Sequence, residues 1–242
     1  MASWSKFLAS VQRRVEALHS AGCPDIYFRG HACADWLLEP GLARHRRFNK
    51  NYSEEFTEQR LFWSFRMRGA HLLPTAANGW TTLFYMQHFG LPTRLLDWST
   101  SFASALYFGI ADGKAKSPCI WILDPYHLNN RFSNSDDVKN ISVSHEIDYI
   151  QFMELAEKPF GAIATEGDSS LERIRSQAGS FTLHSDLGHP LEQLCPSAIT
   201  KHVLDVDHIP KAEKYLELAG VDDFSIFPDL SGLAAKIRKR EL

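Results

Sequence analysis

The spacing of apolar residues divides the chain into alternating helical and strand-like segments. Apolar side chains recur every three or four residues from Trp4 to Leu18, which predicts a first helix that Ser3 caps and Gly22 ends. Further helices are predicted over 53–69, 79–90, 103–111, 170–179 and 210–220, with a last amphipathic helix after the FPDL segment 227–230. Short buried strands are predicted over 25–30, 118–124, 159–165, 179–185 and 198–206. We therefore expect one mixed α+β domain over 1–242, with the helix of residues 1–22 packed on it.

The segment 87–101 is an exception, because strongly polar side chains stand between apolar ones without a helical or strand period. Pro92 favours an extended conformation at the residue before it, so a turn is expected there. A buried charge needs a partner, and we expect Arg94 and Asp97 to bind each other or a ligand. Ser99 or Thr100 is expected to cap the following helix, whose free amides would then suit an anion.

Composition and charge exclude several classes of protein. Hydrophobic residues make up 44% of the 242 residues, charged residues make up 23%, and the net charge of -3 gives no global preference for nucleic acid or membrane. The longest nearly unbroken apolar run, 102–111, is too short to span a bilayer. The first residues lack the apolar core of a signal peptide, which predicts a cytoplasmic protein. Four cysteines are too few for a disulfide scaffold, and we expect them to be reduced.

Arg29 stands at the end of the first predicted strand and is followed by Gly30 and His31. An arginine on a rigid strand can direct its planar guanidinium group at a phosphate or a carboxylate. Gly30 permits either a positive φ or a close approach of another backbone. The structural alternative is a buried ion pair of Arg29, for example with Asp97.

These residues belong to a longer pattern that resembles the FRG domain family, which is named for the (F/Y)RG motif seen at Phe28-Arg29-Gly30. The string MQHFGLPTRLLDWST at 86–100 is its most specific part. Further matching segments lie at 36–44, 105–108, 175–181 and 227–235. The resemblance extends over nearly the whole chain after the first helix.

The order of the motifs is also similar to that of ADP-ribosyltransferases of the arginine–serine–glutamate type. These enzymes carry an arginine at the end of the first strand, then a Ser-Thr-Ser motif, then a Gln-x-Glu motif near a late strand. Arg29, the segment 99–101 and Gln177 stand in the corresponding places, but Gly179 occupies the position of the catalytic glutamate. Asp97, Glu192 or Glu166 are alternative sources of a carboxylate, and the spacing does not select among them.

The resemblance implies an ADP-ribosyltransferase-like fold and roles for individual residues. Arg29 would hold the pyrophosphate of NAD, Ser99 and Thr100 would position the nicotinamide ribose, and an aromatic ring would stack on the nicotinamide. His31 or His88 would act as a base or orient the ligand. The candidate catalytic residues are Arg29, His31, Ser99 and Gln177. The candidate NAD-binding residues are Arg29, Gly30, Gln87, His88, Arg94, Asp97, Trp98, Thr100 and Phe181, with Phe28 as a further stacking candidate.

Two functions remain open at this stage. The first is an enzyme that transfers ADP-ribose from NAD to a nucleic acid or a protein, in a setting of bacterial toxin or anti-phage defence by analogy with related transferases. The second is a noncatalytic module that binds a nucleotide or a nucleic acid, which the missing glutamate favours. Neither reading needs a membrane or a metal.

Other interpretations have weaker support in the sequence. A Ser99–His88–Asp97 hydrolytic triad lacks the Gly-x-Ser-x-Gly turn that such enzymes use. A zinc site at Cys33 and His31 or at Cys195 and His189 lacks the usual C-x-x-C spacing. The basic run at 44–47 with Lys50 is either a solvated loop or a contact to a phosphate backbone.

Overall fold

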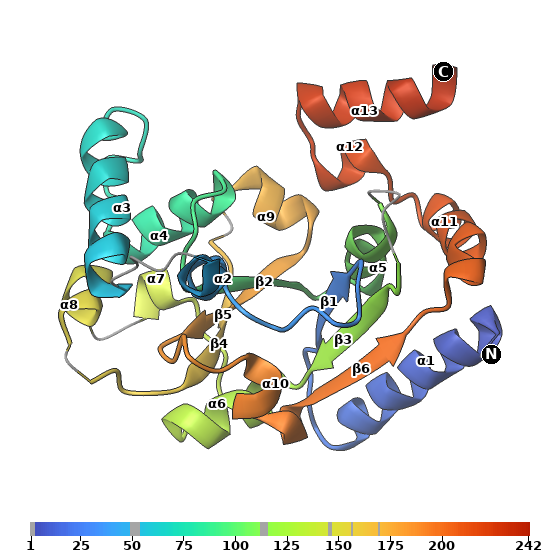
Figure 1. Cartoon of the computed structure of the whole chain (residues 1–242), viewed down its shortest axis with the longest axis horizontal. Coiled ribbons are helices and arrows are strands. Elements are labelled where there is room, and N and C mark those ends of the chain that lie inside the picture. Colours follow the sequence, from blue (N-terminus) through green and yellow to red (C-terminus); the bar gives the residue numbers. More distant parts are fainter. Residues whose placement is uncertain (1–2, 49–53, 112–115, 145–146, 156, 169) are drawn as a thin grey trace.

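Six strands form one open antiparallel sheet in the order β4–β5–β2–β1–β3–β6. The computed structural model describes residues 3–48, 54–111, 116–144, 147–155, 157–168 and 170–242 (Figure 1). Lys50, which belongs to the basic run, and Ser53, where the sequence predicts the start of a helix, lie outside the described residues, as do the side chains of Arg46 and Arg47. The strands are β1 (Tyr27–His31), β2 (Leu95–Ser99), β3 (Cys119–Leu123), β4 (Ala162–Glu166), β5 (Gly179–His184) and β6 (Ile199–Val203).

The described residues also contain thirteen α-helices and two short 3-10 helices. The longer helices are α1 (Trp4–Ser20), α2 (Gly41–Phe48), α3 (Glu54–Arg68), α4 (Gly79–His88), α5 (Phe102–Ile110), α6 (Pro125–Ser133), α11 (Ile209–Leu218) and α13 (Leu230–Glu241). The shorter ones are α7 (Ile141–Ser144), α8 (Tyr149–Glu154), α9 (Glu172–Ser176), α10 (Leu191–Leu194), α12 (Asp223–Ile226), η1 (Pro196–Ala198) and η2 (Val206–His208). No helix in the described ranges has the length and apolar character needed to cross a bilayer.

The mixed α and β architecture is confirmed, and the five predicted strands correspond to β1, β3, β4, β5 and β6. Ser3 caps α1 as predicted, by accepting a hydrogen bond from the amide of Lys6. The central strand β2 was not predicted. Four of its five side chains are buried, on both faces of the sheet, and Asp97 alone is exposed, so the sequence shows no alternation there. Helix α2 was also not predicted as a helix, because its basic residues were assigned to a loop.

The sheet opens between its two central strands. Strands β1 and β2 pair only at Phe28 and Ser99, whereas each of the other four neighbouring pairs has five residue pairs in register. Helices α1, α5 and α11 lie beside the half that contains β1, β3 and β6, and α3, α4 and α8 lie beside the other half (Figure 1). On these helix-covered sides the two halves pack on different apolar clusters, whereas a third cluster, which includes Tyr27, Trp98 and Ala164, joins both halves.

Gly30 allows α5 to lie directly on β1. A Cβ atom at this position would lie 1.8 Å from the carbonyl oxygen of Ala105 and 2.6 Å from the amide nitrogen of Gly109, so no larger residue fits. Gly30 does not have a positive φ. Of the two expectations for this glycine, close backbone approach is the correct one, and the approaching backbone is a helix of the same chain.

Arg94 forms a buried ion pair with Glu58, and the predicted Arg94–Asp97 pair is wrong. The Arg94 Nε and Nη2 atoms each donate to a Glu58 carboxylate oxygen at 2.5 Å, and Nη1 donates to the carbonyls of His184 and Ser185. Tyr149 donates its hydroxyl to the same carboxylate. Burial and the Glu58 charge raise the pKa of Tyr149, which therefore remains a hydrogen-bond donor. The pair joins α3 and α8 to the ends of β2 and β5.

Removal of one partner of this pair leaves a buried charge without compensation. We expect Glu58→Gln and Arg94→Met to lower the free energy of unfolding by about 3–5 kcal/mol each. Chemical denaturation of the purified chain measures this loss. The exposed pair of Lys139 and Asp137, 3.2 Å apart, is a matched control, and Lys139→Met should cost less than about 1 kcal/mol. Equal midpoints for Arg94→Met and the parent would contradict the assignment.

Candidate functional site

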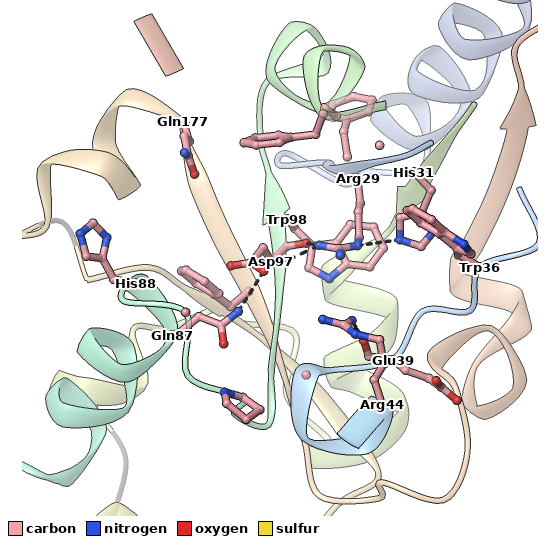
Figure 2. A pocket seen from close by; sticks show the side chains of 18 of the residues that line it. Arg29, His31, Trp36, Glu39, Arg44, Gln87, His88, Asp97, Trp98 and Gln177 are labelled. Atoms are coloured by element: carbon pink, nitrogen blue, oxygen red, sulfur yellow. Dashed lines mark hydrogen bonds and ion pairs between the residues drawn. The ribbon is translucent and has the colours of Figure 1, made fainter. Parts of the chain in front are cut away.

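A cavity of about 1140 Å³ occupies the gap between β1 and β2. Residues from β1, β2, α2, α4, α5, α9 and the turn after β1 line it, so segments from both halves of the sheet contribute (Figure 2). Among the residues predicted for the site, those on its wall are Phe28, Arg29, Gly30, His31, Gln87, His88, Asp97, Trp98, Gln177 and Phe181. Arg94, Ser99 and Thr100 are not on its wall. Ten of the thirteen candidate residues thus lie on the wall of one cavity, and three do not.

Arg29 spans the gap in the sheet with its guanidinium group. Its Nη1 donates to the main-chain carbonyl of Asp97 at 2.6 Å and lies 3.9 Å from the Asp97 carboxylate. Its Nε donates to Nε2 of His31 at 2.9 Å. Burial lowers the pKa of Arg29 to about 10, against the opposing effect of Asp97, so the group stays protonated at neutral pH. Within the described residues, Nη2 has no hydrogen-bond partner, and it borders the cavity.

His31 holds Arg29 in place and is itself kept neutral. Both ring nitrogens face N–H donors, because Trp121 points its indole N–H at Nδ1 at 3.3 Å. A neutral imidazole has one lone pair available, and the shorter contact assigns it to Nε2 and Arg29. Burial and the Arg29 charge lower the pKa of His31 to about 3. A general base would need the lone pair that Arg29 occupies, and what His31 orients in this structure is the guanidinium group of Arg29.

Asp97 lies across the cavity mouth from His31 and is oriented by side chains of its own segment. Its carboxylate Oδ2 accepts a hydrogen bond from Gln87 Nε2 at 2.9 Å. Thr93 donates its hydroxyl to the Gln87 carbonyl oxygen at 2.5 Å and accepts the amide of Leu95 at 3.0 Å. Gln87, Thr93 and Asp97, three of the polar residues in the segment 87–97, therefore form one directed chain of hydrogen bonds that ends at the cavity.

The opposite wall comes from α9 and the turn after it. Gln177 donates its side-chain amide to the carbonyl of Ile226 at 3.2 Å, which leaves its carbonyl oxygen on the cavity side (Figure 2). The guanidinium group of Arg173 lies over the ring of Phe227, 4.6 Å from its centre. The segment around α12 thus fixes two polar residues of the cavity wall. Burial, followed by the charge of Arg173, lowers the pKa of His88 beside them.

Ser99 connects β2 to the turn that carries Gln177, and it does not face the cavity. Its hydroxyl donates to the main-chain carbonyl of Gln177 at 2.7 Å and accepts the amide of Ser101 at 2.9 Å. The amide of Thr100 donates to the carbonyl of Ala178, which has the unusual φ of 48°. The geometry therefore does not support a contact of Ser99 or Thr100 with a ribose.

The cap of α5 also differs from the expectation. Ser101, not Ser99 or Thr100, caps this helix by accepting the amide of Ser104 at 3.2 Å. No residue from 99 to 104 is on the cavity wall, so the expected anion site at this helix terminus is not part of the cavity. The hydroxyl of Ser99 is used by the main chain, and its donor bond goes to a carbonyl, so the alternative hydrolytic triad is not formed.

Several cavity residues were not identified in the sequence as site residues: Trp36, Phe84, Phe108, Arg173 and Ile174. Arg173 stands four residues before Gln177 around one helical turn, and this spacing was a usable signal. The side chain of Trp36 is 55% exposed at the cavity rim, and Arg44 beside it donates to the carbonyl of Glu39 at 2.5 Å.

No group of three or more metal-ligating side chains occurs among the described residues.

The neutral state of His31 predicts a pH dependence of stability. The folded-state pKa of about 3 lies below the ordinary value of 6.5, so the unfolded chain binds a proton first as the pH falls. This residue therefore lowers the free energy of unfolding by up to about 1.4 kcal/mol for each pH unit below 6.5. His184, fully buried and with its pKa also lowered to about 3, acts in the same direction.

Urea unfolding of the parent and of His31→Gln at pH 7, 6 and 5 measures this effect. Glutamine offers a carbonyl oxygen to Arg29 and does not titrate, so the variant should lose less stability between pH 7 and 5 than the parent. Equal slopes in the two proteins would show that His31 is protonated alike in the folded and unfolded states.

Comparison with known proteins gives one result that bears on identity. No curated protein and no solved structure gives a significant match to the chain. The family model of the FRG domain matches residues 24–117, which include the Phe28-Arg29-Gly30 motif and the whole of β1, β2, α4 and α5. The matched segment ends before β3, so the expectation of one FRG domain over 1–242 stays a prediction outside 24–117. The match thus identifies an FRG domain over residues 24–117.

Proposed function

We propose that this protein uses NAD as a substrate and transfers its ADP-ribosyl group to an acceptor, either a nucleic acid or a protein. The observation that carries the proposal is the placement of three motifs that are far apart in the sequence. Arg29 lies on β1, Ser99 ends β2 and Gln177 immediately precedes β5, and these strands are neighbours in the order β5–β2–β1. Ser99 is in register with both Phe28 and Gly179. This is the motif order that the sequence shares with ADP-ribosyltransferases.

The residues of the cavity suit a dinucleotide. Its volume of about 1140 Å³ is slightly above the roughly 300–1,000 Å³ that ligand pockets usually have, so it has room for a dinucleotide. Arg29 offers a rigid guanidinium group with free N–H donors, which suits a pyrophosphate. Phe84, Phe181 and the exposed ring of Trp36 provide aromatic surfaces for the bases. Gln177 presents a carbonyl oxygen that accepts an N–H or hydroxyl donor of the ligand.

The transfer is balanced without a redox step. The bond between the ribose C1′ and nicotinamide breaks, and nicotinamide leaves with the electron pair of that bond. An oxygen or nitrogen of the acceptor then bonds to C1′ and releases its proton. Arg29 binds the diphosphate throughout, and its bonds to His31 and Asp97 keep it in one orientation while charge moves at the ribose.

One observation favours the second candidate, a noncatalytic module that binds a nucleotide or a nucleic acid. Gly179 stands at the position of the catalytic glutamate, and a Cβ there would lie 3.2 Å from both the side chain and the carbonyl of Ile174. The close packing of α9 thus leaves little room for a larger side chain at this point. A binding module would retain affinity for NAD and release no nicotinamide.

Two measurements on the purified chain separate the candidates. Isothermal titration calorimetry with NAD tests binding, and chromatography of nicotinamide after incubation with NAD, alone or with nucleic acid and protein extracts, tests turnover. Binding with nicotinamide release supports the transferase. Binding without release supports the noncatalytic module, and no binding contradicts both forms of the proposal for NAD.

Arg29→Lys tests the ligand role of the arginine. Lysine keeps the positive charge but cannot contact His31, Asp97 and a phosphate with one planar group. We expect the variant to stay folded and to bind NAD about 10- to 100-fold more weakly, as follows from the loss of one or two charge-assisted hydrogen bonds.

Arg131→Lys, at an exposed position on α6, is the matched control and should bind NAD like the parent. The melting temperature of each variant is measured alongside. A stable Arg29→Lys protein with parental NAD affinity would contradict the proposed binding mode. A large fall in melting temperature with unchanged affinity would assign Arg29 to the structure alone.

A further inference from the structure

We propose that Asp97 supplies the catalytic carboxylate of this site and that Gln87 and Thr93 are the residues that position it. The proposal rests on the proposed transferase function and names the group that replaces the missing glutamate. Three carboxylates were open alternatives from the sequence, and the structure separates them. Asp97 is on the cavity wall, whereas Glu166 ends β4 and Glu192 binds the amide of Leu38, both away from the cavity.

The donor and acceptor of each hydrogen bond between Thr93, Gln87 and Asp97 follow from the groups involved. The hydroxyl of Thr93 accepts from the Leu95 amide, a group that can only donate, so its own proton is free for the Gln87 carbonyl oxygen. This bond fixes the Gln87 amide with its nitrogen toward Asp97. The amide N–H then binds Oδ2, and Oδ1 has no hydrogen-bond partner among the described residues. An acceptor-only carboxylate is thus held in one orientation by a donor that cannot rotate freely.

Two other carboxylates on the cavity wall lack these properties. Glu39 is buried beside Arg44, and its carboxylate points away from Arg29 (Figure 2). Asp35 lies in the exposed turn after β1 and has no hydrogen bond among the described residues. Asp97 is half exposed, with 57% of its side chain accessible, and its Oδ2 lies 3.9 Å from Arg29 Nη1. It alone combines access to a ligand, fixed orientation and the neighbouring arginine.

The carboxylate performs two tasks in the proposed reaction. Its negative charge stabilises the positive charge that develops on the ribose when the bond from C1′ to nicotinamide breaks. Oδ1 then accepts the proton that the attacking oxygen or nitrogen releases as it bonds to C1′. With water as the acceptor, the products are ADP-ribose, nicotinamide and one proton, so NAD alone is a sufficient probe.

The test compares four variants of the full chain with NAD as the only substrate. Asp97→Asn keeps the shape and removes the charge, Thr93→Val removes the hydroxyl, Thr93→Ser retains it, and Glu166→Gln is a carboxylate control outside the cavity. We expect Asp97→Asn to lower kcat for nicotinamide release at least 100-fold with little change in NAD affinity. Thr93→Val should lower kcat about tenfold, and Thr93→Ser and Glu166→Gln should act like the parent.

A second readout follows the positioning chain without any need for turnover. The side-chain amide protons of Gln87, assigned by their loss in Gln87→Leu, should shift in the NMR spectra of Asp97→Asn and Thr93→Val and keep their position in Thr93→Ser. Unchanged Gln87 resonances in Thr93→Val would overturn the positioning role of Thr93, whatever the activity.

The outcomes distinguish the two levels of the proposal. An active parent with an equally active Asp97→Asn overturns the assignment of Asp97 and leaves the transferase function standing. A parent that binds NAD and releases no nicotinamide contradicts the transferase and the catalytic role together, and the Gln87 resonances then still decide whether the carboxylate is positioned as described. Loss of activity in Thr93→Val that Thr93→Ser does not rescue would place the effect in the fold.

Discussion

The separation of β1 from β2 is the feature on which the rest of the structure depends. Two antiparallel neighbours in a sheet normally satisfy each other's main-chain groups along their whole length. Here β1 and β2 pair only at Phe28 and Ser99, and the main-chain N–H and carbonyl groups beyond this pair need other partners. Arg29 supplies one of them, because its guanidinium group donates to the main-chain carbonyl of Asp97. The same side chain therefore completes the opened sheet and borders the cavity that the opening creates. Gly30 allows α5 to lie directly on β1, and Ala105 and Phe108 of this helix also line the cavity.

The dense polar segment 87–97 is explained by two separate networks that leave it in different directions. Gln87, Thr93 and Asp97 form a chain of hydrogen bonds toward the cavity. Arg94 points away from them into the interior, where Glu58 and two carbonyl groups hold it. The buried pair is costly to desolvate and is retained with full hydrogen bonding, so it fixes the start of β2 relative to α3 and α8. The orientation of Asp97, three residues further on, depends on that fixed start. A structural ion pair and a candidate functional carboxylate are thus parts of one strand.

The sequence predicted the helices and strands whose signals lie within a few residues of each other. It did not predict side-chain partners that are far apart in the sequence. The first helix, its Ser3 cap and the edge strands follow from spacing and end signals that lie within a few residues. The Glu58–Arg94 pair links positions 36 residues apart, and no local rule selects Glu58 over other acidic residues. Glu58 does lie four residues before the fully buried Phe62, on the same helix face, which is the one local sign that it is buried. The resemblance to the Ser-Thr-Ser motif of the transferases assigned Ser99 a contact with the ligand. Its hydroxyl instead donates to the main-chain carbonyl of Gln177. Most of the candidate residues line one cavity because they stand at the ends of apolar elements, and the central strands separate there.

The cavity requires more of the chain than the segment that the FRG family model matches. Residues 24–117 provide Arg29, His31, Gln87 and Asp97, which form one wall and the mouth. Arg173, Gln177 and Phe181 provide the other wall, and they follow the matched segment by more than fifty positions. The carbonyl of Ile226 holds Gln177 and the ring of Phe227 holds Arg173, so the segment near residue 226 contributes to this wall. A ligand between these walls contacts both halves of the opened sheet, so its binding energy also opposes their separation. In the proposed function, the segments after residue 117 would therefore contribute to ligand specificity as much as the FRG motif does, because they supply one wall of the cavity.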